Sequence, residues 1–207
     1  MLQVKHLTKQ YRAGHPIFQD YSAEFKPGTA VGVVGPNGSG KTTFLRILSV
    51  NSFPTSGSVT FNDIDIHDNP SSYLKEVGLV HDEEHLPRHL TAAELLEWVM
   101  KSRNIWDEES SDTIATIFEK LDLDEIHEPI GTFSTGMKKK TQIAAAMILN
   151  PAILIMDEPL RGLDQNTRET VTSMIEESKR KNSLVLMSSH SMEEIRHLFD
   201  EMIEFPL

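Results

Sequence analysis

Residues 35–42, Gly-Pro-Asn-Gly-Ser-Gly-Lys-Thr, decide the fold of this 207-residue chain. They match the pattern G-x-x-x-x-G-K-[ST] in full. The apolar run ahead of them, residues 30–34, is short, β-branched and flanked by glycines, which predicts a buried strand. Residues 44–49 behind them have helical spacing. We therefore predict a phosphate-binding loop between a strand and a helix.

This loop predicts binding of a nucleoside triphosphate, and each residue type has a chemical reason. Glycines at 35, 38 and 40 let backbone N–H groups surround a phosphate without side-chain clashes. The helix that begins near Lys41 points the positive end of its dipole at the anion. Lys41 is expected to reach the β- and γ-phosphates, and the Thr42 hydroxyl to ligate Mg²⁺. The alternative, a glycine-rich turn with a chance lysine, does not account for the full match in this context.

A second apolar run, residues 152–156, ends in two carboxylates, Asp157 and Glu158. In an open α/β sheet, the carboxyl ends of the strands form the edge at which ligands bind. We expect Asp157 to hold Mg²⁺ through water and Glu158 to accept a proton from the attacking water. Acidic residues are also common at exposed strand ends, but the pairing with the loop at Lys41 favours a functional site.

A third apolar run, residues 184–187, ends in Ser-Ser-His. Continuous apolar strands that alternate with helices predict an α/β fold, with a parallel sheet covered on both faces. A capping box at residues 191–194 predicts a last helix, and residues 202–205 predict a final short strand.

The middle of the chain has a different pattern. Thr91 and Glu94 form a capping box at the start of an amphipathic helix. A second helix is expected over residues 107–121. Residues 83–135 are therefore predicted to be a helical insert between strands of the sheet.

The composition is that of an ordinary globular protein, with 39% hydrophobic and 25% charged residues and a formal net charge of −11. This acidic balance argues against a nucleic-acid-binding surface spread over the whole molecule, although it is compatible with a local basic patch. No nucleic-acid partner is expected. The absence of cysteine excludes disulfides and thiolate zinc sites. The sequence shows no apolar run typical of a secretory signal at its start, and none near the ~18 apolar residues of a membrane span. We expect any work at a membrane to depend on docking to a partner.

The order of these motifs resembles that of the ATP-binding cassette (ABC) ATPases over essentially the whole chain. The resemblance implies a P-loop NTPase core with a parallel sheet, a small N-terminal antiparallel β part and a helical subdomain insert. It implies a single ABC ATPase domain over residues 1–207. The core is expected at about 1–82 and 136–207, and the helical subdomain at about 83–135.

Residues 133–137, Phe-Ser-Thr-Gly-Met, look like the signature loop of the family. In the family this loop opens a helix and contacts the γ-phosphate of ATP bound to the opposite subunit. Ser134 and Gly136 match that loop, whereas Thr135 replaces a usual glycine and Met137 a usual glutamine. From the residues alone, Ser134 is expected to cap the helix, a role compatible with phosphate contact.

Three further positions resemble functional residues of the family. Asp164 matches an aspartate at the dimer interface, His190 a histidine that contacts the γ-phosphate, and Tyr11 an aromatic that stacks on adenine. Without the resemblance, we would expect His190 to have a structural role and Tyr11 to pack against the N-terminal sheet. The resemblance implies that Lys41, Glu158 and His190 take part in catalysis. The expected nucleotide-binding residues are Tyr11, Gly35, Asn37, Gly38, Ser39, Gly40, Lys41, Thr42, Thr43, Ser134, Gly136 and Asp164.

The resemblance also implies a function, that of an ATPase subunit that uses ATP and Mg²⁺. In the family two such domains enclose two ATP molecules, so a homodimer or a paired homologous chain is implied. The pattern S-x-G-M-x-K at residues 134–139 looks like efflux-type ATPases, which indicates an exporter with separate integral membrane permease subunits. The chain is then expected at the cytoplasmic face of the membrane, as a peripheral subunit.

Two alternatives stand beside this interpretation. A soluble ABC ATPase of DNA repair or translation usually carries two cassettes or long coiled-coil arms, neither of which this sequence has. A regulatory subunit that barely hydrolyses ATP is disfavoured by the presence of Lys41, Glu158 and His190.

Residues 80–86, Val-His-Asp-Glu-Glu-His-Leu, contain the H-x-x-E-H pattern of some zinc proteases. A zinc site would need a helix to place His81 and His85 on one face, whereas the segment follows an expected strand and meets Pro87. A solvated polar loop is a second interpretation. In ABC ATPases this junction carries a glutamine that senses Mg²⁺, and Asp82 stands in its place. Since a carboxylate can ligate Mg²⁺ but repels the γ-phosphate without it, we expect a stronger Mg²⁺ dependence of coupling.

Overall fold

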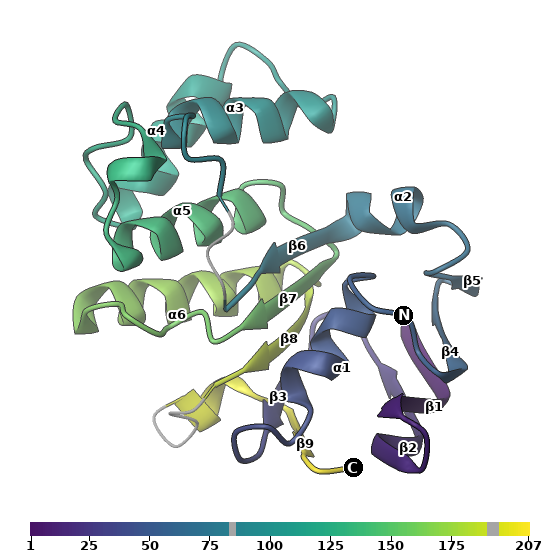
Figure 1. The fold of residues 1–207 in the computed structure, drawn as a ribbon. Coiled ribbons are helices and arrows are strands. Elements are labelled where there is room, and N and C mark those ends of the chain that lie inside the picture. The colour runs from purple at the N-terminus through teal and green to yellow at the C-terminus, as the bar shows by residue number, and fades with distance from the viewer. Residues whose placement is uncertain (83–85, 190–194) are drawn as a thin grey trace.

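The computed structural model describes residues 1–82, 86–189 and 195–207, which form two sheets with helices packed around them (Figure 1). The strands are β1 (Leu2–Arg12), β2 (His15–Phe25), β3 (Ala30–Val34), β4 (Ser56–Phe61), β5 (Ile64–Asp65), β6 (Val77–Val80), β7 (Ile153–Asp157), β8 (Leu184–Ser188) and β9 (Glu201–Glu204). The helices are α1 (Lys41–Leu48), α2 (Pro70–Tyr73), α3 (Ala92–Ser102), α4 (Ser110–Lys120), α5 (Thr135–Met147) and α6 (Gln165–Arg180), with the 3₁₀ helices η1 (Leu74–Glu76), η2 (Ile130–Thr132) and η3 (Arg196–Leu198).

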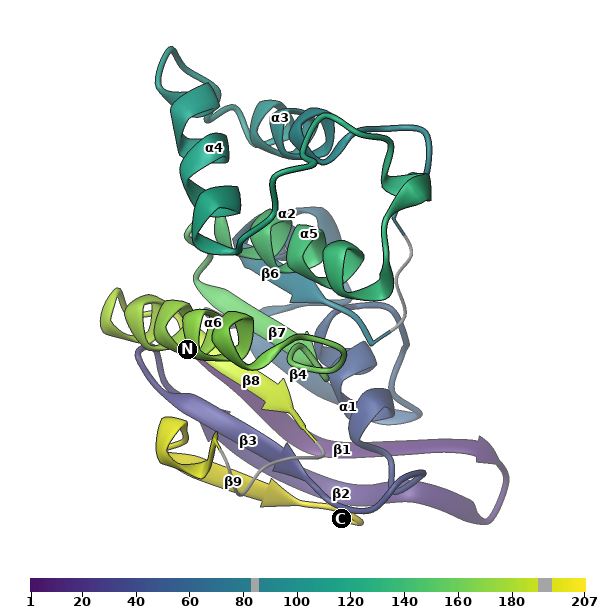
Figure 2. The ribbon, with the colours of Figure 1, turned by 90° about the vertical axis from the view of Figure 1, so that its left-hand side faces the viewer.

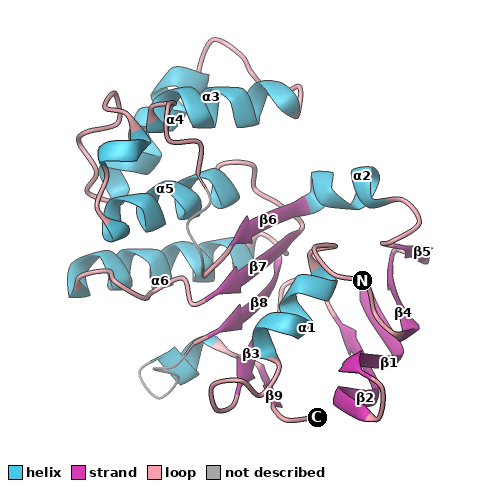
Figure 3. Cartoon of the chain, in the orientation of Figure 1, coloured by secondary structure: helices cyan, strands magenta, loops and turns pink. Residues whose placement is uncertain are grey.

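The larger sheet has five strands in the order β6-β7-β8-β3-β9, and each neighbouring pair is parallel (Figure 3). The predicted parallel α/β fold is confirmed. Because the strands run in one direction, the loops after β3, β6, β7 and β8 leave the sheet at the same edge. That edge is where the predicted phosphate loop and acidic residues meet.

The strands of this sheet read as continuous apolar runs because both of its faces are buried. On β7, Ile153 and Ile155 belong to the core shared with α1 and the smaller sheet. Leu154 and Met156, which alternate with them, belong to the core shared with α3, α4, α5 and α6. Successive side chains of a strand point to opposite faces, so one pentapeptide serves two cores.

The smaller sheet is antiparallel, in the order β2-β1-β4-β5. Its apolar face packs toward α1, where Phe18 of β2 meets Phe44 of α1 edge to face with ring centroids 6.0 Å apart. The predicted N-terminal antiparallel part is thus present, and β4 and β5 after α1 complete it.

The helical layer lies beyond α5 as seen from the sheet, and Figure 2 shows α3 and α4 stacked over it. The capping box of α3 is confirmed, since Thr91 accepts from the Glu94 N–H and the Glu94 carboxylate from the Thr91 N–H. Helix α4 begins at Ser110, three residues later than predicted. The Asp107 carboxylate accepts from the Glu109 N–H and the Ser110 hydroxyl, which forms a turn ahead of the helix. The division into core and helical subdomain stays a prediction.

The boundaries of the other predicted strands agree with the sequence prediction to within one residue. Strand β3 lies where it was expected, β7 is shifted by one residue, and β8 continues to Ser188. Strand β9 ends at Glu204, although the next N–H, that of Phe205, still donates to the Val34 carbonyl at 2.7 Å. The last helix predicted at residues 191–194 lies outside the described residues.

Candidate nucleotide-binding site

The predicted phosphate loop lies between β3 and α1, and two of its glycines are required by their backbone conformation and their neighbours. Gly35 has φ +143° and Gly40 φ +111°, which side chains disfavour. A Cβ at Gly35 would lie 2.5 Å from the Phe205 carbonyl oxygen, and one at Gly40 would lie 2.4 Å from Ile17 Cγ2. The loop is therefore pressed against β2 and the chain end, and only glycine fits at both positions.

The loop also positions Lys41, whose side chain is buried. Its ammonium group donates to the carbonyls of Gly35 at 2.8 Å and Pro36 at 3.0 Å. Helix α1 starts here with no side-chain cap and no acidic residue in its first turn. Its first N–H groups and the positive end of its dipole are thus left for an anion.

A cavity of about 370 Å³ opens beside this loop and collects most of the predicted site residues. It is lined by Ile17, Asn37, Gly38, Gly40, Lys41, Thr42, Thr43, Asp82, Asp157, Glu158 and Arg161. These residues come from β2, the phosphate loop, α1 and the loops after β6 and β7. Parallel strand polarity brings them together from distant parts of the sequence.

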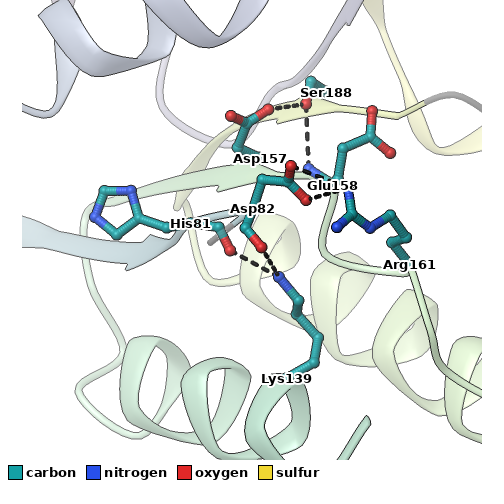
Figure 4. Close-up of polar contacts among 7 residues, drawn as sticks. All are labelled: His81, Asp82, Lys139, Asp157, Glu158, Arg161 and Ser188. Atoms are coloured by element: carbon teal, nitrogen blue, oxygen red, sulfur yellow. Dashed lines mark hydrogen bonds and ion pairs between the residues drawn. The ribbon is translucent and has the colours of Figure 1, made fainter. Parts of the chain in front are cut away.

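The two acidic residues at the end of β7 share one neighbour, Ser188 of β8 (Figure 4). The Ser188 hydroxyl donates to Asp157 Oδ1 and accepts from the Glu158 N–H at 3.2 Å. Glu158 has φ +50°, a left-handed conformation that is unfavourable for a glutamate. The contacts to Ser188 hold this conformation, which directs the Glu158 carboxylate toward the cavity.

Asp82 enters the same cavity from the loop after β6 and is held at three points. Arg161 Nη1 lies 2.8 Å from Asp82 Oδ1 and donates to Oδ2 at 3.0 Å. The buried ammonium of Lys139, on α5, donates to the carbonyls of His81 at 2.7 Å and Asp82 at 3.3 Å. Figure 4 shows these contacts beside Asp157 and Glu158.

The zinc interpretation of H-x-x-E-H gains no support. His81 Nε2 lies 3.3 Å from the Asn51 side-chain amide. Glu84 and His85 lie outside the described residues. Among the described residues, no group of three or more His, Asp or Glu side chains could hold a metal ion on its own.

Several predicted site residues lie away from this cavity. Ser134 caps α5, as predicted, by accepting from the Met137 N–H at 3.2 Å, and its side chain is exposed. Gly136 lies beside the loop after β7, where an added Cβ would be 3.1 Å from the Gly162 carbonyl oxygen. The exposed Asp164 caps α6, and the two hydrogen bonds from Thr167 lower its pKa.

Three further predicted residues also do not line the cavity. Tyr11 is 65% exposed, with Lys9 Nζ 4.8 Å from its ring centroid, and it does not line the cavity. By contrast, Ile17, which no motif indicated, lines the cavity. Gly35 and Ser39 belong to the loop without lining the cavity. His190 lies outside the described residues.

The residues present fit a triphosphate with Mg²⁺. The open N-terminus of α1 and Lys41 supply the donors and the positive charge that phosphates require. Thr42 and Asp157 supply hydroxyl and carboxylate oxygens, the hard ligands that Mg²⁺ prefers alongside substrate phosphates.

Besides Ile17, the sequence analysis did not identify three residues of the site, namely Ser188, Arg161 and Lys139. Ser188 directly follows an apolar run, as Asp157 follows its own, and this shared position was a usable signal. Arg161 and Lys139 carried no such signal, because their partners lie far away in the sequence.

Comparisons with known proteins identify the family of the chain. Residues 18–161 match the family described as ABC transporter. The chain is 32% identical to the "ABC transporter ATP-binding protein NatA" of Bacillus subtilis, over 89% of this chain and 76% of that protein. It is 31% identical to the "Lantibiotic transport ATP-binding protein SrtF" of Streptococcus pyogenes, over 97% of this chain and 84% of that protein.

Two solved structures share the fold. One, of an "ATP binding subunit of ABC transporter", superposes with a TM-score of 0.92 at 25% identity, covering 99% of this chain and 85% of the other. The cassette MJ0796, described as a dimer in a post-hydrolysis state bound to ADP and Pi, gives a TM-score of 0.88 at 24% identity, covering 99% and 94%.

Proposed function

The chain belongs to the ABC transporter family, and we propose that it is the ATP-binding and ATP-hydrolysing subunit of a membrane exporter. The observation that carries the proposal is the cavity in which the phosphate loop, Thr42, Asp157 and Glu158 meet.

The residues of the cavity have separate roles in this proposal. The loop N–H groups and Lys41 bind and orient the triphosphate, and Thr42 and Asp157 hold Mg²⁺. Mg²⁺, when bound, offsets the charge on the phosphate oxygens. Glu158 accepts the proton of the attacking water, and Ser188 keeps its backbone in the required conformation.

The positions of two signature-loop residues support a dimer. Ser134 and Gly136 lie outside it, at the start of α5, and Ser134 is exposed. The two residues match the family's signature loop, so we expect them to contact a phosphate. They can do so only if the start of α5 in one subunit lies against the nucleotide bound to a second subunit. The MJ0796 cassette, which shares the fold, is described as dimeric. We propose a homodimer or a pair with a homologous chain.

Membership of the ABC transporter family supports separate permease subunits as partners. In the described part of the chain, no helix has both the length and the apolar character needed to cross a bilayer. The proposed location is the cytoplasmic face of the membrane. Export is favoured by the S-x-G-M-x-K pattern and by the likeness to a protein named for lantibiotic transport.

The function is tested in two steps. The purified chain should release phosphate from ATP with Mg²⁺, and Lys41→Ala, tested in parallel, should not. The tagged chain should then co-purify from detergent-solubilised native membranes with an integral membrane protein. Recovery with ribosomes or DNA, and never with a membrane protein, would contradict the transporter while leaving the ATPase intact.

A further inference from the structure

Arg161 and Asp82 form an ion pair at the mouth of the cavity, between the loops that follow β7 and β6 (Figure 4). One guanidinium nitrogen, Nη1, lies within 2.8 Å of one carboxylate oxygen and 3.0 Å of the other. Both side chains line the cavity that the proposed function assigns to ATP, so a role of this pair in nucleotide binding rests on that function.

Local structure places Arg161 at this point. Its N–H donates to the Glu158 carbonyl at 3.3 Å, which closes a turn over residues 158–161. Pro159 occupies the second position of this turn, where its restricted φ is favourable. The turn reverses the chain after β7, and the Arg161 side chain reaches Asp82 at the edge of the sheet.

A second contact, from α5, holds the backbone of Asp82. Lys139, on α5, donates to the carbonyls of His81 and Asp82, which connects the backbone at these two residues to α5. The Asp82 carboxylate is therefore held between a backbone anchor on one element and a cation on another. Arg161 is the part of this arrangement that acts on the carboxylate itself.

The charge of the cavity explains why this contact matters. Three carboxylates line the cavity, those of Asp82, Asp157 and Glu158, against the cations of Lys41 and Arg161. A triphosphate must enter this acidic surrounding. Mg²⁺ offsets the repulsion when it arrives with the nucleotide, but a metal-free nucleotide depends on the protein's own cations.

We propose that Arg161 is a positioning residue of the nucleotide site, which holds the Asp82 carboxylate and neutralises it until Mg²⁺ is present. The ion pair permits nucleotide entry without metal. With metal-bound nucleotide in the cavity, the charge of Asp82 would be offset by Mg²⁺, and Arg161 would no longer be needed for that purpose.

The test is a measurement of nucleotide affinity with and without metal. Binding of a non-hydrolysable ATP analogue is titrated in EDTA and again in excess Mg²⁺, for the wild type, Arg161→Ala, Asp82→Asn and the double variant. Arg161→Ala should weaken metal-free binding roughly ten-fold and metal-bound binding less than about three-fold. In the Asp82→Asn background the same substitution should change metal-free binding less than about three-fold.

Two further variants separate charge from architecture. Arg161→Lys keeps the charge and should bind metal-free analogue within about three-fold of the wild type. Arg46→Ala removes an exposed arginine of α1 outside the cavity and should leave both affinities unchanged. Circular dichroism and urea unfolding show whether each variant is folded. If Arg161→Ala does not fold, the affinities of Asp82→Asn and Arg161→Lys test the proposal instead.

The proposal is overturned if Arg161→Ala weakens binding equally in EDTA and Mg²⁺, or if its effect persists in the Asp82→Asn background. Either result would make Arg161 an ordinary structural or phosphate-binding residue. If the folded wild type binds no analogue under either condition, the proposed ATPase function fails first. The two failures are thereby distinguished.

Discussion

Ser188, at the end of β8, donates its hydroxyl proton to the carboxylate of Asp157, at the end of the neighbouring strand β7. The two residues are register partners in the parallel sheet. The same hydroxyl accepts from the Glu158 N–H, so one fully buried serine orders both acidic residues of the site.

We predict that Ser188→Ala lowers ATP hydrolysis about ten-fold, because Asp157 loses a donor and the Glu158 backbone an acceptor. The free energy of unfolding should fall by about 1–3 kcal/mol. The matched control is Ser183→Ala, which removes a buried hydroxyl that donates to the Pro151 carbonyl at 2.7 Å, just before β8 and away from the cavity. It should lower stability in urea unfolding and leave turnover unchanged. Equal turnover losses in both variants would count against a role of Ser188 in the site.

Glu158→Gln should keep nucleotide binding and lose about 10²–10⁴-fold in hydrolysis, because the amide cannot accept the proton of water. With ATP bound and not hydrolysed, the variant should elute as a dimer in size-exclusion chromatography. Undiminished turnover would remove Glu158 as the base.

Lys41→Ala should weaken binding of Mg²⁺-ATP at least ten-fold, since it removes the cation held within the loop by the carbonyls of Gly35 and Pro36. Equilibrium dialysis or a fluorescent analogue gives the affinity. Lys181→Ala, a lysine 2.8 Å from the Glu177 carboxylate and outside the cavity, is the comparison variant and should bind normally. Unaltered affinity in Lys41→Ala contradicts the phosphate-loop assignment.

Lys139→Met should lower the free energy of unfolding by about 1–3 kcal/mol, because two carbonyls in the loop after β6 lose a donor. It should also weaken nucleotide binding, because that loop carries Asp82 into the cavity. Lys140→Met, next in the same helix, removes a buried amine that donates to the Asp122 carbonyl at 2.7 Å. We expect it to lower stability alone, and a similar loss of affinity in both would show that the effect is not specific to this loop.

Asp200 should make stability depend on acid pH. Burial raises its pKa, but the Ala30 N–H at 2.8 Å and the Lys179 ammonium at 2.7 Å hold the pKa below its usual value. A lowered pKa in the folded state means that the contribution to stability is present above the unfolded pKa, near 4, and is lost as the pH falls through the folded pKa.

Urea unfolding between pH 7 and pH 2.5 checks this dependence. Asp200→Asn should have a lower midpoint than the wild type at pH 7, and the difference should shrink as the pH falls. Glu204→Gln, an exposed acid on β9, should show no such convergence. If the difference in urea midpoint between Asp200→Asn and the wild type stayed constant from pH 7 to pH 2.5, Asp200 would not be a cause of the acid dependence.

The sequence by itself determined the features that depend on local chemistry. The phosphate loop, the three apolar runs and the caps at Thr91 and Ser134 were all predicted, because each rests on residues within a few positions of one another. Helical and strand periodicity, cap hydrogen bonds and backbone conformation are local properties, so they can be read without the fold. Strand polarity then placed Asp157 and Glu158 at the same edge as the loop.

Only the tertiary structure decided the contacts that connect distant elements. Arg161 meets Asp82 across 79 positions, Lys139 meets His81 across 58, and Ser188 meets Asp157 across 31. No spacing rule predicts such pairs, because they depend on strand order and on where each turn directs its side chain. The identity of Asp82 was plain in the sequence, but its pairing with Arg161 exists only because the strands β6 and β7 end side by side at the edge of a parallel sheet.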